Sequence, residues 1–217
     1  MPKCYLLLLQ LIIAISLNAQ IKKHSILLGG QLSYYNDQIQ VENFNQKTVS
    51  GTFGISIGKA FKENSVVGIN INFSPLKQSN YLTFSDTGTY TYTRFDAGIF
   101  LREYKRLAKD LYVFGQGDVA YITAYQKEEY KISPYDIKAS QRGGLIALTA
   151  GIAYQLLKKM QLEMTLPNIL IMQYNRMKYS NEDPQAKDTK REHISFYSNL
   201  NNNTSLGWLG VGFRFLL

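Results

Sequence analysis

The sequence predicts an all-β protein: an eight-stranded antiparallel up-and-down transmembrane β-barrel, preceded by a cleavable signal peptide. Three observations predict this fold class. Apolar and polar residues alternate along several segments, and long and short connections alternate between those segments. A content of 16 Tyr, 11 Phe and 16 Gly favours strands. With 45% hydrophobic residues among 217, the chain can bury a core, which excludes a disordered protein.

The first 19 residues have the pattern of a signal peptide, and residues 20–217 are expected to form one barrel domain. Lys3 supplies the positive start, Leu6 to Leu17 form an apolar core, and Ala19 is a small residue suited to cleavage. The apolar stretch ends before Lys22, which is short of the roughly 20 residues of a membrane helix. Cys4 is the only cysteine, so we expect no disulfide in the mature chain.

Period-two alternation identifies the strands in the first half of the chain. Along 52–58 three apolar residues alternate with Thr, Gly and Ser, along 67–74 four apolar residues alternate with Gly, Asn and Ser, and along 94–102 the polar face carries charge. The apolar faces consist of Phe53, Ile55 and Ile57, then Val67, Ile69, Ile71 and Phe73, then Phe95, Ala97, Ile99 and Leu101.

The second half follows the same rule with one ambiguous segment. Residues 161–166 and 208–217 alternate clearly, whereas 143–157 is apolar on both faces and allows a buried helix as well as the strand we expect. The predicted strands are 24–35, 48–60, 65–75, 91–103, 110–125, 141–157, 160–174 and 203–217.

The connections between these strands alternate in length. Short ones are expected near 60–64, 104–109 and 158–159, and long polar ones near 36–47, 76–90, 126–140 and 175–202. Short periplasmic turns and longer external loops are the layout of an outer-membrane barrel, with both chain ends in the periplasm.

The polar faces of the strands indicate a membrane barrel. A soluble barrel of the lipocalin type points its apolar residues at a ligand cavity, and a membrane barrel points them at lipid. Gly, small polar residues and charges of both signs suit a narrow eight-stranded interior. We therefore expect an interior charge network, either a polar plug or a narrow ion path, made of Arg94, Asp96, Arg102, Asp118, Glu163 and Arg214. A soluble exported barrel that binds a hydrophobic ligand is the alternative.

Aromatic residues and the chain end support the same interpretation. Tyrosines next to the long connections predict an aromatic girdle, made of Tyr34, Tyr35, Tyr90, Tyr92, Tyr121, Tyr125 and Tyr174. Residues 208–217 resemble the C-terminal signal recognised by the barrel-assembly machinery, with Phe213, Phe215 and Leu217 on one face. With the strand pattern, the chain resembles the small outer-membrane β-barrel domain family of Gram-negative bacteria, of the OmpX/OmpA type. The resemblance implies an eight-stranded barrel in the cell outer membrane.

One pair of residues suggests an enzyme as an alternative. His193 and Ser195 resemble the His-x-Ser pair of eight-stranded lipid A deacylases, in which the His is the general base and the Ser the nucleophile. The carboxylate of that family follows the Ser, whereas no Asp or Glu follows Glu192 here. We expect no catalytic site.

The remaining sequence indicates a structural or surface-interaction role through the long external loops. No P-loop, dinucleotide-binding fingerprint or zinc motif is present, so we expect no cofactor and no metal. The charge of +8 includes no basic run of the nucleic-acid-binding type. The expected partners are outer-membrane lipid and lipopolysaccharide, and the barrel-assembly machinery during biogenesis. A narrow channel remains a further alternative.

Overall fold

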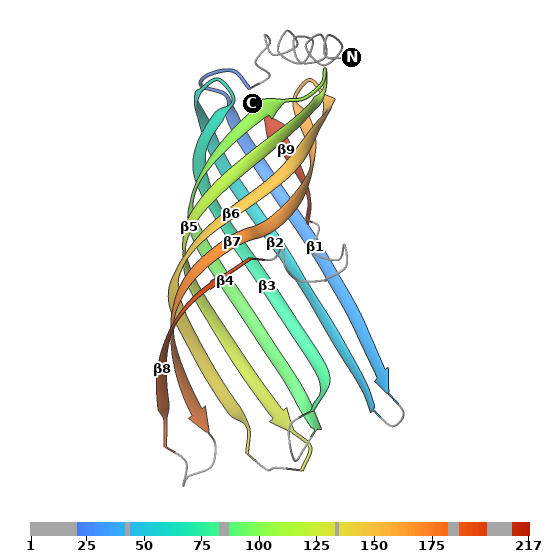
Figure 1. The fold of residues 1–217 in the computed structure, drawn as a ribbon, viewed down its shortest axis with the longest axis vertical. Coiled ribbons are helices and arrows are strands. Elements are labelled where there is room, and N and C mark those ends of the chain that lie inside the picture. Colours follow the sequence, from blue (N-terminus) through green and yellow to red (C-terminus); the bar gives the residue numbers. More distant parts are fainter. Residues whose placement is uncertain (1–20, 42–43, 83–86, 133–134, 182–186, 199–209) are drawn as a thin grey trace, which may run out of the picture.

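The computed structural model describes residues 21–41, 44–82, 87–132, 135–181, 187–198 and 210–217. The predicted signal peptide therefore lies outside the described residues. The described part holds nine strands, drawn in Figure 1. They are β1 (Ile26–Val41), β2 (Phe44–Lys62), β3 (Ser65–Leu82), β4 (Thr87–Arg106), β5 (Leu111–Tyr130), β6 (Ile137–Leu157), β7 (Met160–Asn181), β8 (Thr189–Tyr197) and β9 (Gly210–Leu216). Within these residues, no helix is long and apolar enough to cross a membrane.

The strands form a closed antiparallel ring with eight positions, which confirms the predicted barrel. Each strand from β1 to β7 pairs with the next, and β9 pairs with both β7 and β1. Two backbone hydrogen bonds of 3.0 and 2.8 Å between Ile26 and Leu217 join the first and last strands. The segment 143–157 lies within β6 and is a strand, as expected.

The eighth position is occupied by two strands in succession, β8 and β9. Of the predicted strand 203–217, residues 203–209 lie outside the described residues and β9 covers the part from Gly210, whereas β8 was not predicted as a strand. β9 pairs with the beginning of β7, and β8 pairs with its second half. Between them β7 contains a bulge, since Leu148 and Ala150 of β6 pair with Leu170 and Leu166. Pro167 lies in this bulge, and a proline cannot donate a hydrogen bond to a neighbouring strand. β7 is therefore locally disrupted where its partner changes from β9 to β8.

The expected long loops are mostly strand, which is a second correction. The ladder between β1 and β2 continues to the pair Val41 and Phe44, and that between β4 and β5 continues to Gly88 and Tyr130. The segment 175–202 likewise contains the end of β7 and all of β8. In water both faces of a strand can be polar, so the alternation that marks a strand in lipid disappears while the backbone ladder continues.

The apolar faces point outward, as a membrane barrel requires. Along β2 the exposed fractions of Phe53, Ile55 and Ile57 are 56, 48 and 48%, while the intervening Gly54 and Gly58 are buried. Large apolar side chains are exposed in the same way on every strand of the ring. This arrangement contradicts the soluble alternative, in which the apolar faces would line the interior.

The short-turn end, expected to face the periplasm, is filled by an apolar core inside the ring. Phe100, Tyr104 and Phe114 pack there with Leu27 and Val66, and all five side chains are at most 6% exposed. Some inward positions have no room for a side chain: a Cβ on Gly58 would lie 2.7 Å from Val66 Cγ1 and 3.0 Å from Phe100 Cζ. Packed side chains therefore fill the interior of the barrel at this end.

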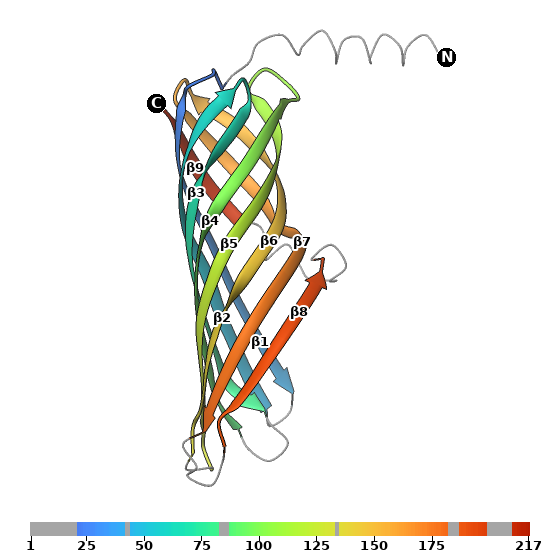
Figure 2. The same cartoon turned by 90° about the vertical axis from the view of Figure 1, so that its left-hand side faces the viewer.

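Among the described residues, the opposite half of the barrel, called here the outer half, is open along one side. The ladder between β1 and β9 ends at the pair Leu32 and Val211, whereas β1 continues with β2 to Val41. Among the described elements β8 pairs only with β7, and it follows β7 toward the outer end (Figure 2). Figure 1 shows β8 and the outer part of β1 at opposite sides of the molecule. The outer half is thus a curved sheet with two edges.

Candidate functional site

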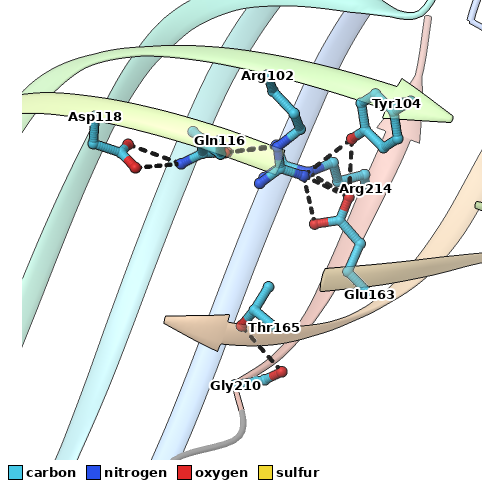
Figure 3. A network of polar contacts seen from close by, with 9 residues as sticks. Arg102, Tyr104, Gln116, Asp118, Glu163, Thr165, Gly210 and Arg214 are labelled. Atoms are coloured by element: carbon cyan, nitrogen blue, oxygen red, sulfur yellow. Dashed lines mark hydrogen bonds and ion pairs between the residues drawn. The ribbon is translucent and has the colours of Figure 1, made fainter. Parts of the chain in front are cut away.

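A buried ion cluster lies next to the apolar core, on the side that faces the outer half. Glu163 on β7 accepts hydrogen bonds from Arg102 Nη1 at 2.7 and 2.8 Å, and from Arg214 Nε at 2.7 Å (Figure 3). The Tyr104 hydroxyl lies 3.0 Å from both Arg102 Nη1 and Glu163 Oε1. The Arg102 guanidinium also stacks 4.1 Å from the Phe114 ring centre. Glu163 thus binds two arginines from β4 and β9, which ties three strands together across the interior.

Amide side chains continue this cluster toward the outer half. Arg102 Nε donates to Gln116 at 2.6 Å, and Gln116 Nε2 donates to both oxygens of Asp118 at 2.8 and 3.0 Å. Asn70 donates to Asp118 at 2.6 Å. In this way the carboxylate of Asp118 is bound by two amides rather than by a direct ion pair.

A second ion pair lies nearer the outer half. Arg94 Nε lies 3.1 Å from Asp96, which also accepts a 2.8 Å hydrogen bond from Asn72. The structure therefore places all six predicted interior charges on inward faces, as three arginines and three carboxylates of zero net charge. Their partners Tyr104, Gln116 and Asn70 were not among the predicted site residues, although each alternates in phase with the polar face of its strand.

From these charges toward the outer end, the interior widens into a cavity of about 430 Å³. One wall, on β1 to β3, is polar, and the opposite wall on β5 to β7 is apolar. The polar wall includes Gln31, Ser33, Ser50, Thr52, Asn70 and Asn72, and the apolar wall includes Ala120, Leu145, Ala147 and Ile171. Arg102, Glu163 and Arg214 form its floor. The cavity is thus closed toward the periplasmic end by the ion cluster and the apolar core.

The predicted aromatic girdle divides between the two faces of the barrel. Tyr34, Tyr121, Tyr125 and Tyr174 are outward and 44 to 67% exposed, as a girdle requires. Tyr35 and Tyr92 line the cavity instead, and Tyr90 shares the inward face of Tyr92. The signal that separates them was available, since odd and even positions of a strand lie on opposite faces.

His193 and Ser195 lie on the inward face of β8, opposite Asn175 and Gln173. The nearby carboxylate of Glu192 is on the outward face, where it lies 3.6 Å from Arg176 Nε. Glu192 therefore cannot orient the His193 imidazole as a catalytic carboxylate would. Within the described residues, no group of three or more His, Cys, Asp or Glu side chains could hold a metal ion.

Two residues of the predicted assembly signal, Phe213 and Phe215, lie on the outward face of β9, and Leu217 directly follows the strand. Phe213, Phe215 and Leu217 are 44, 45 and 67% exposed, and Arg214 between them points into the ion cluster. One short strand thus presents a continuous apolar face to lipid and a buried cation to the interior.

A closed ring with an apolar outer surface and a charged interior defines an outer-membrane β-barrel protein, located in the outer membrane. No family model and no curated protein matches the sequence. Solved structures share the fold. The outer membrane protein OprG from Pseudomonas aeruginosa aligns with a TM-score of 0.53 and 13% identity, over 92% of this chain and 99% of its own.

A major outer membrane protein from Thermus thermophilus aligns with a TM-score of 0.52 and 10% identity, over 89% of this chain and 99% of its own. At these identities the likeness concerns the fold. The fold is that of the small outer-membrane β-barrels, in agreement with the resemblance seen in the sequence.

Proposed function

We propose that this protein is a non-enzymatic surface-interaction barrel whose outer half binds an extended segment of a partner protein along the open edge of the sheet. The observation that carries this proposal is the second edge of β8, which has no neighbouring strand among the described residues. An unpaired strand edge offers a row of N–H and C=O groups to an incoming strand.

The depth of this edge in the membrane supports a partner strand. The outward side chains of Ile194 and Phe196 are 66 and 73% exposed, and they lie opposite Tyr174 and Met172 of the lipid-facing surface. This end of β8 is therefore at the depth of the bilayer, where lipid cannot satisfy backbone hydrogen bonds. An added strand would satisfy them.

The sealed floor supports a binding role over transport. The packed core and the Glu163 cluster fill the periplasmic end, so the described part of the chain offers a recess open to the outside. The outward position of the Glu192 carboxylate supports the non-enzymatic assignment.

The test is site-specific photo-crosslinking in intact cells. A photoreactive amino acid replaces Phe196 or Ile194 at the edge, or Ile146 on β6 as the matched control. Ile146 is 52% exposed on the same outward surface, but β6 has strands on both sides. We expect Phe196 and Ile194 to give one discrete protein adduct, and Ile146 to give lipid adducts only.

Peptide mapping of the adduct gives the decisive readout. Strand addition places residues two apart on the same face, so crosslinks from Ile194 and Phe196 should map two residues apart on one partner segment. Lipid adducts alone at the edge positions, or protein adducts equally from Ile146, would contradict the proposal.

A further inference from the structure

Basic residues cluster on the outward face of β6, β7 and β8. We call them the outer basic patch, defined as Lys138, Arg142, Arg176, Lys178 and Lys190. Strand register places Arg142 directly opposite Arg176, and Lys178 directly opposite Lys190. The side chains of Arg176 and Lys178 are 62 and 54% exposed. Five cations therefore share one surface, and four of them form two like-charged cross-strand pairs.

This arrangement is unfavourable for an isolated sheet. Like charges directly opposite each other on neighbouring strands repel. Two carboxylates compensate in part, since Glu192 lies 3.6 Å from Arg176 and Asp188 lies 3.0 Å from Lys178. Next to the patch, Lys127 on β5 lies directly opposite Lys138 and forms ion pairs with Glu129 and Asp136. With these three residues included, six cations against four carboxylates leave an excess of two positive charges. An external anion between the strands would relieve this repulsion.

The patch lies at the boundary of the lipid-facing surface. The next outward row toward the periplasmic end consists of Gly144, Tyr174 and Ile194, and the row after it of Ile146, Met172 and Phe196. The large side chains in these two rows are 44 to 73% exposed. The patch therefore begins where the apolar surface ends, at the depth of the outer-leaflet headgroups.

The like-charged pairs are concentrated on one side of the barrel. On β4, the outward positions above Phe95 are Thr93, Thr91 and Thr89, which carry no charge. The outward cations Lys47 on β2 and Lys77 on β3 are not cross-strand partners, because Lys47 pairs with a serine and Lys77 with a valine. A general attraction to a charged membrane surface would not require this asymmetry, so the pairs on β6, β7 and β8 indicate a local site.

From these observations we propose that the outer basic patch binds the phosphorylated headgroup of an outer-leaflet lipid, whose acyl chains lie against Ile146, Met172 and Tyr174. Arginine matches a phosphate through two parallel hydrogen bonds, and Arg142 and Arg176 face each other at the row nearest the apolar surface. Lys178 and Lys190, in the next outward row away from the apolar surface, neutralise further negative charge of the headgroup. This inference is independent of the proposed partner-binding edge.

The experiment measures lipid binding to the purified full-length barrel in detergent by native mass spectrometry. The probes are bisphosphorylated lipid A, dephosphorylated lipid A, phosphatidylcholine and inorganic phosphate. We expect bisphosphorylated lipid A to bind at least about tenfold more tightly than the other two lipids. Inorganic phosphate at the same concentration should not displace it, because phosphate lacks the acyl chains.

The decisive variant is the double substitution Arg142→Gln with Arg176→Gln. Its matched control is Lys47→Gln with Lys77→Gln, which removes the same charge from outward positions on β2 and β3. We expect about tenfold weaker binding of lipid A to the patch variant, because it removes the two guanidinium groups that face each other and would bind the phosphate. The control should bind within about twofold of the wild type, because its two lysines do not face each other across strands.

A charge-conserving variant distinguishes binding through the arginine geometry from binding through net charge, and a mobility assay checks that each variant folds. Arg142→Lys with Arg176→Lys keeps the charge but loses the two-pronged geometry, so we expect it to recover only part of the affinity. Gel mobility of unheated samples verifies that each variant is folded, and the single Arg142→Gln variant replaces the double one if that fails to fold. Unchanged binding in the patch variant, equal weakening in the control, or displacement by inorganic phosphate would overturn the proposal.

Discussion

At the scale of single residues, the interior shows how a membrane barrel accommodates ions. A buried charge is tolerated when it is paired and hydrogen-bonded. Glu163 satisfies this requirement for both Arg102 and Arg214, and Gln116 carries the hydrogen bonding on to Asp118. Removing the carboxylate would leave two arginines unpaired in a region that water hardly reaches.

We therefore expect Glu163→Ala to lower the free energy of unfolding by about 3–5 kcal/mol, the range for breaking a buried ion pair. Urea unfolding in lipid vesicles, followed by unheated gel mobility, measures this change. The matched control is Glu192→Ala, whose exposed pair with Arg176 at 3.6 Å should contribute about 1 kcal/mol or less. Equal effects of the two substitutions would show that the Glu163 cluster is not a structural clamp.

The charged members of this cluster could be predicted from the sequence, and their partners only in part. Alternation places Arg102 and Glu163 on polar faces without any knowledge of the fold. Which residues meet across the interior depends on ring closure: Glu163 and Arg102 are 61 positions apart in the chain. Odd and even positions of a strand lie on opposite faces, so the sequence alone could have assigned each tyrosine to the girdle or to the cavity.

At the scale of elements, the hairpins project as paired strands beyond the lipid-facing surface. Ion pairs such as Lys127–Glu129 and Lys178–Asp188 lie on these extensions. Their ends could not be predicted by periodicity, because a strand with water on both sides needs no apolar face. The change of partner along β7, from β9 to β8, could not be predicted by periodicity either, although Pro167 lies in the bulge where the partner changes.

The β7–β8 hairpin allows a prediction about pH. The Lys178 ammonium, 3.0 Å from Asp188, lowers the pKa of that carboxyl below its ordinary value of 3.8 through a hydrogen bond and charge attraction. A lowered pKa in the folded state means that the pair stabilises the hairpin above pH 3.8 and is lost as the pH falls through the lowered pKa.

Hydrogen exchange of the Lys178 and Lys190 amides measures this effect. These residues are cross-strand partners near the tip of the hairpin. After correction for intrinsic exchange, we expect their protection to stay constant from neutral pH to about pH 4 and to fall at lower pH. Asp188→Asn should remove the step. A step near neutral pH, or one that persists in Asp188→Asn, would assign the effect to another group.

At the scale of the whole molecule, the barrel has two unlike halves. The half that holds the short turns is filled with packed side chains, and the outer half is a recess that is open along one side among the described residues. The ring and the outward direction of its apolar faces follow from alternation. The closure of the cavity at one end could not be predicted from alternation, because it depends on inward aromatic residues such as Phe100 and Phe114 meeting across the ring.

This division leads to a prediction about conduction. We expect the wild-type protein to show no steady conductance in planar lipid bilayers, because Phe100, Tyr104 and Phe114 pack at one end beneath the Glu163 cluster. An ion crossing the barrel would have to displace both the apolar core and the paired arginines. Eight strands leave an interior only wide enough for side chains.

The rival expectation of a narrow ion path gives the opposite result. In that case, single-channel steps should appear and should vanish in Asp118→Asn or Arg214→Gln, which remove charges from the route. If the floor is a plug, the wild type and Asp118→Asn should both be silent, while Arg214→Gln should lose stability instead, because Glu163 and Ser56 lose a hydrogen-bond donor. Gel mobility of unheated, reconstituted samples shows that silence comes from inserted barrels, so conductance and stability together distinguish a plug from a path.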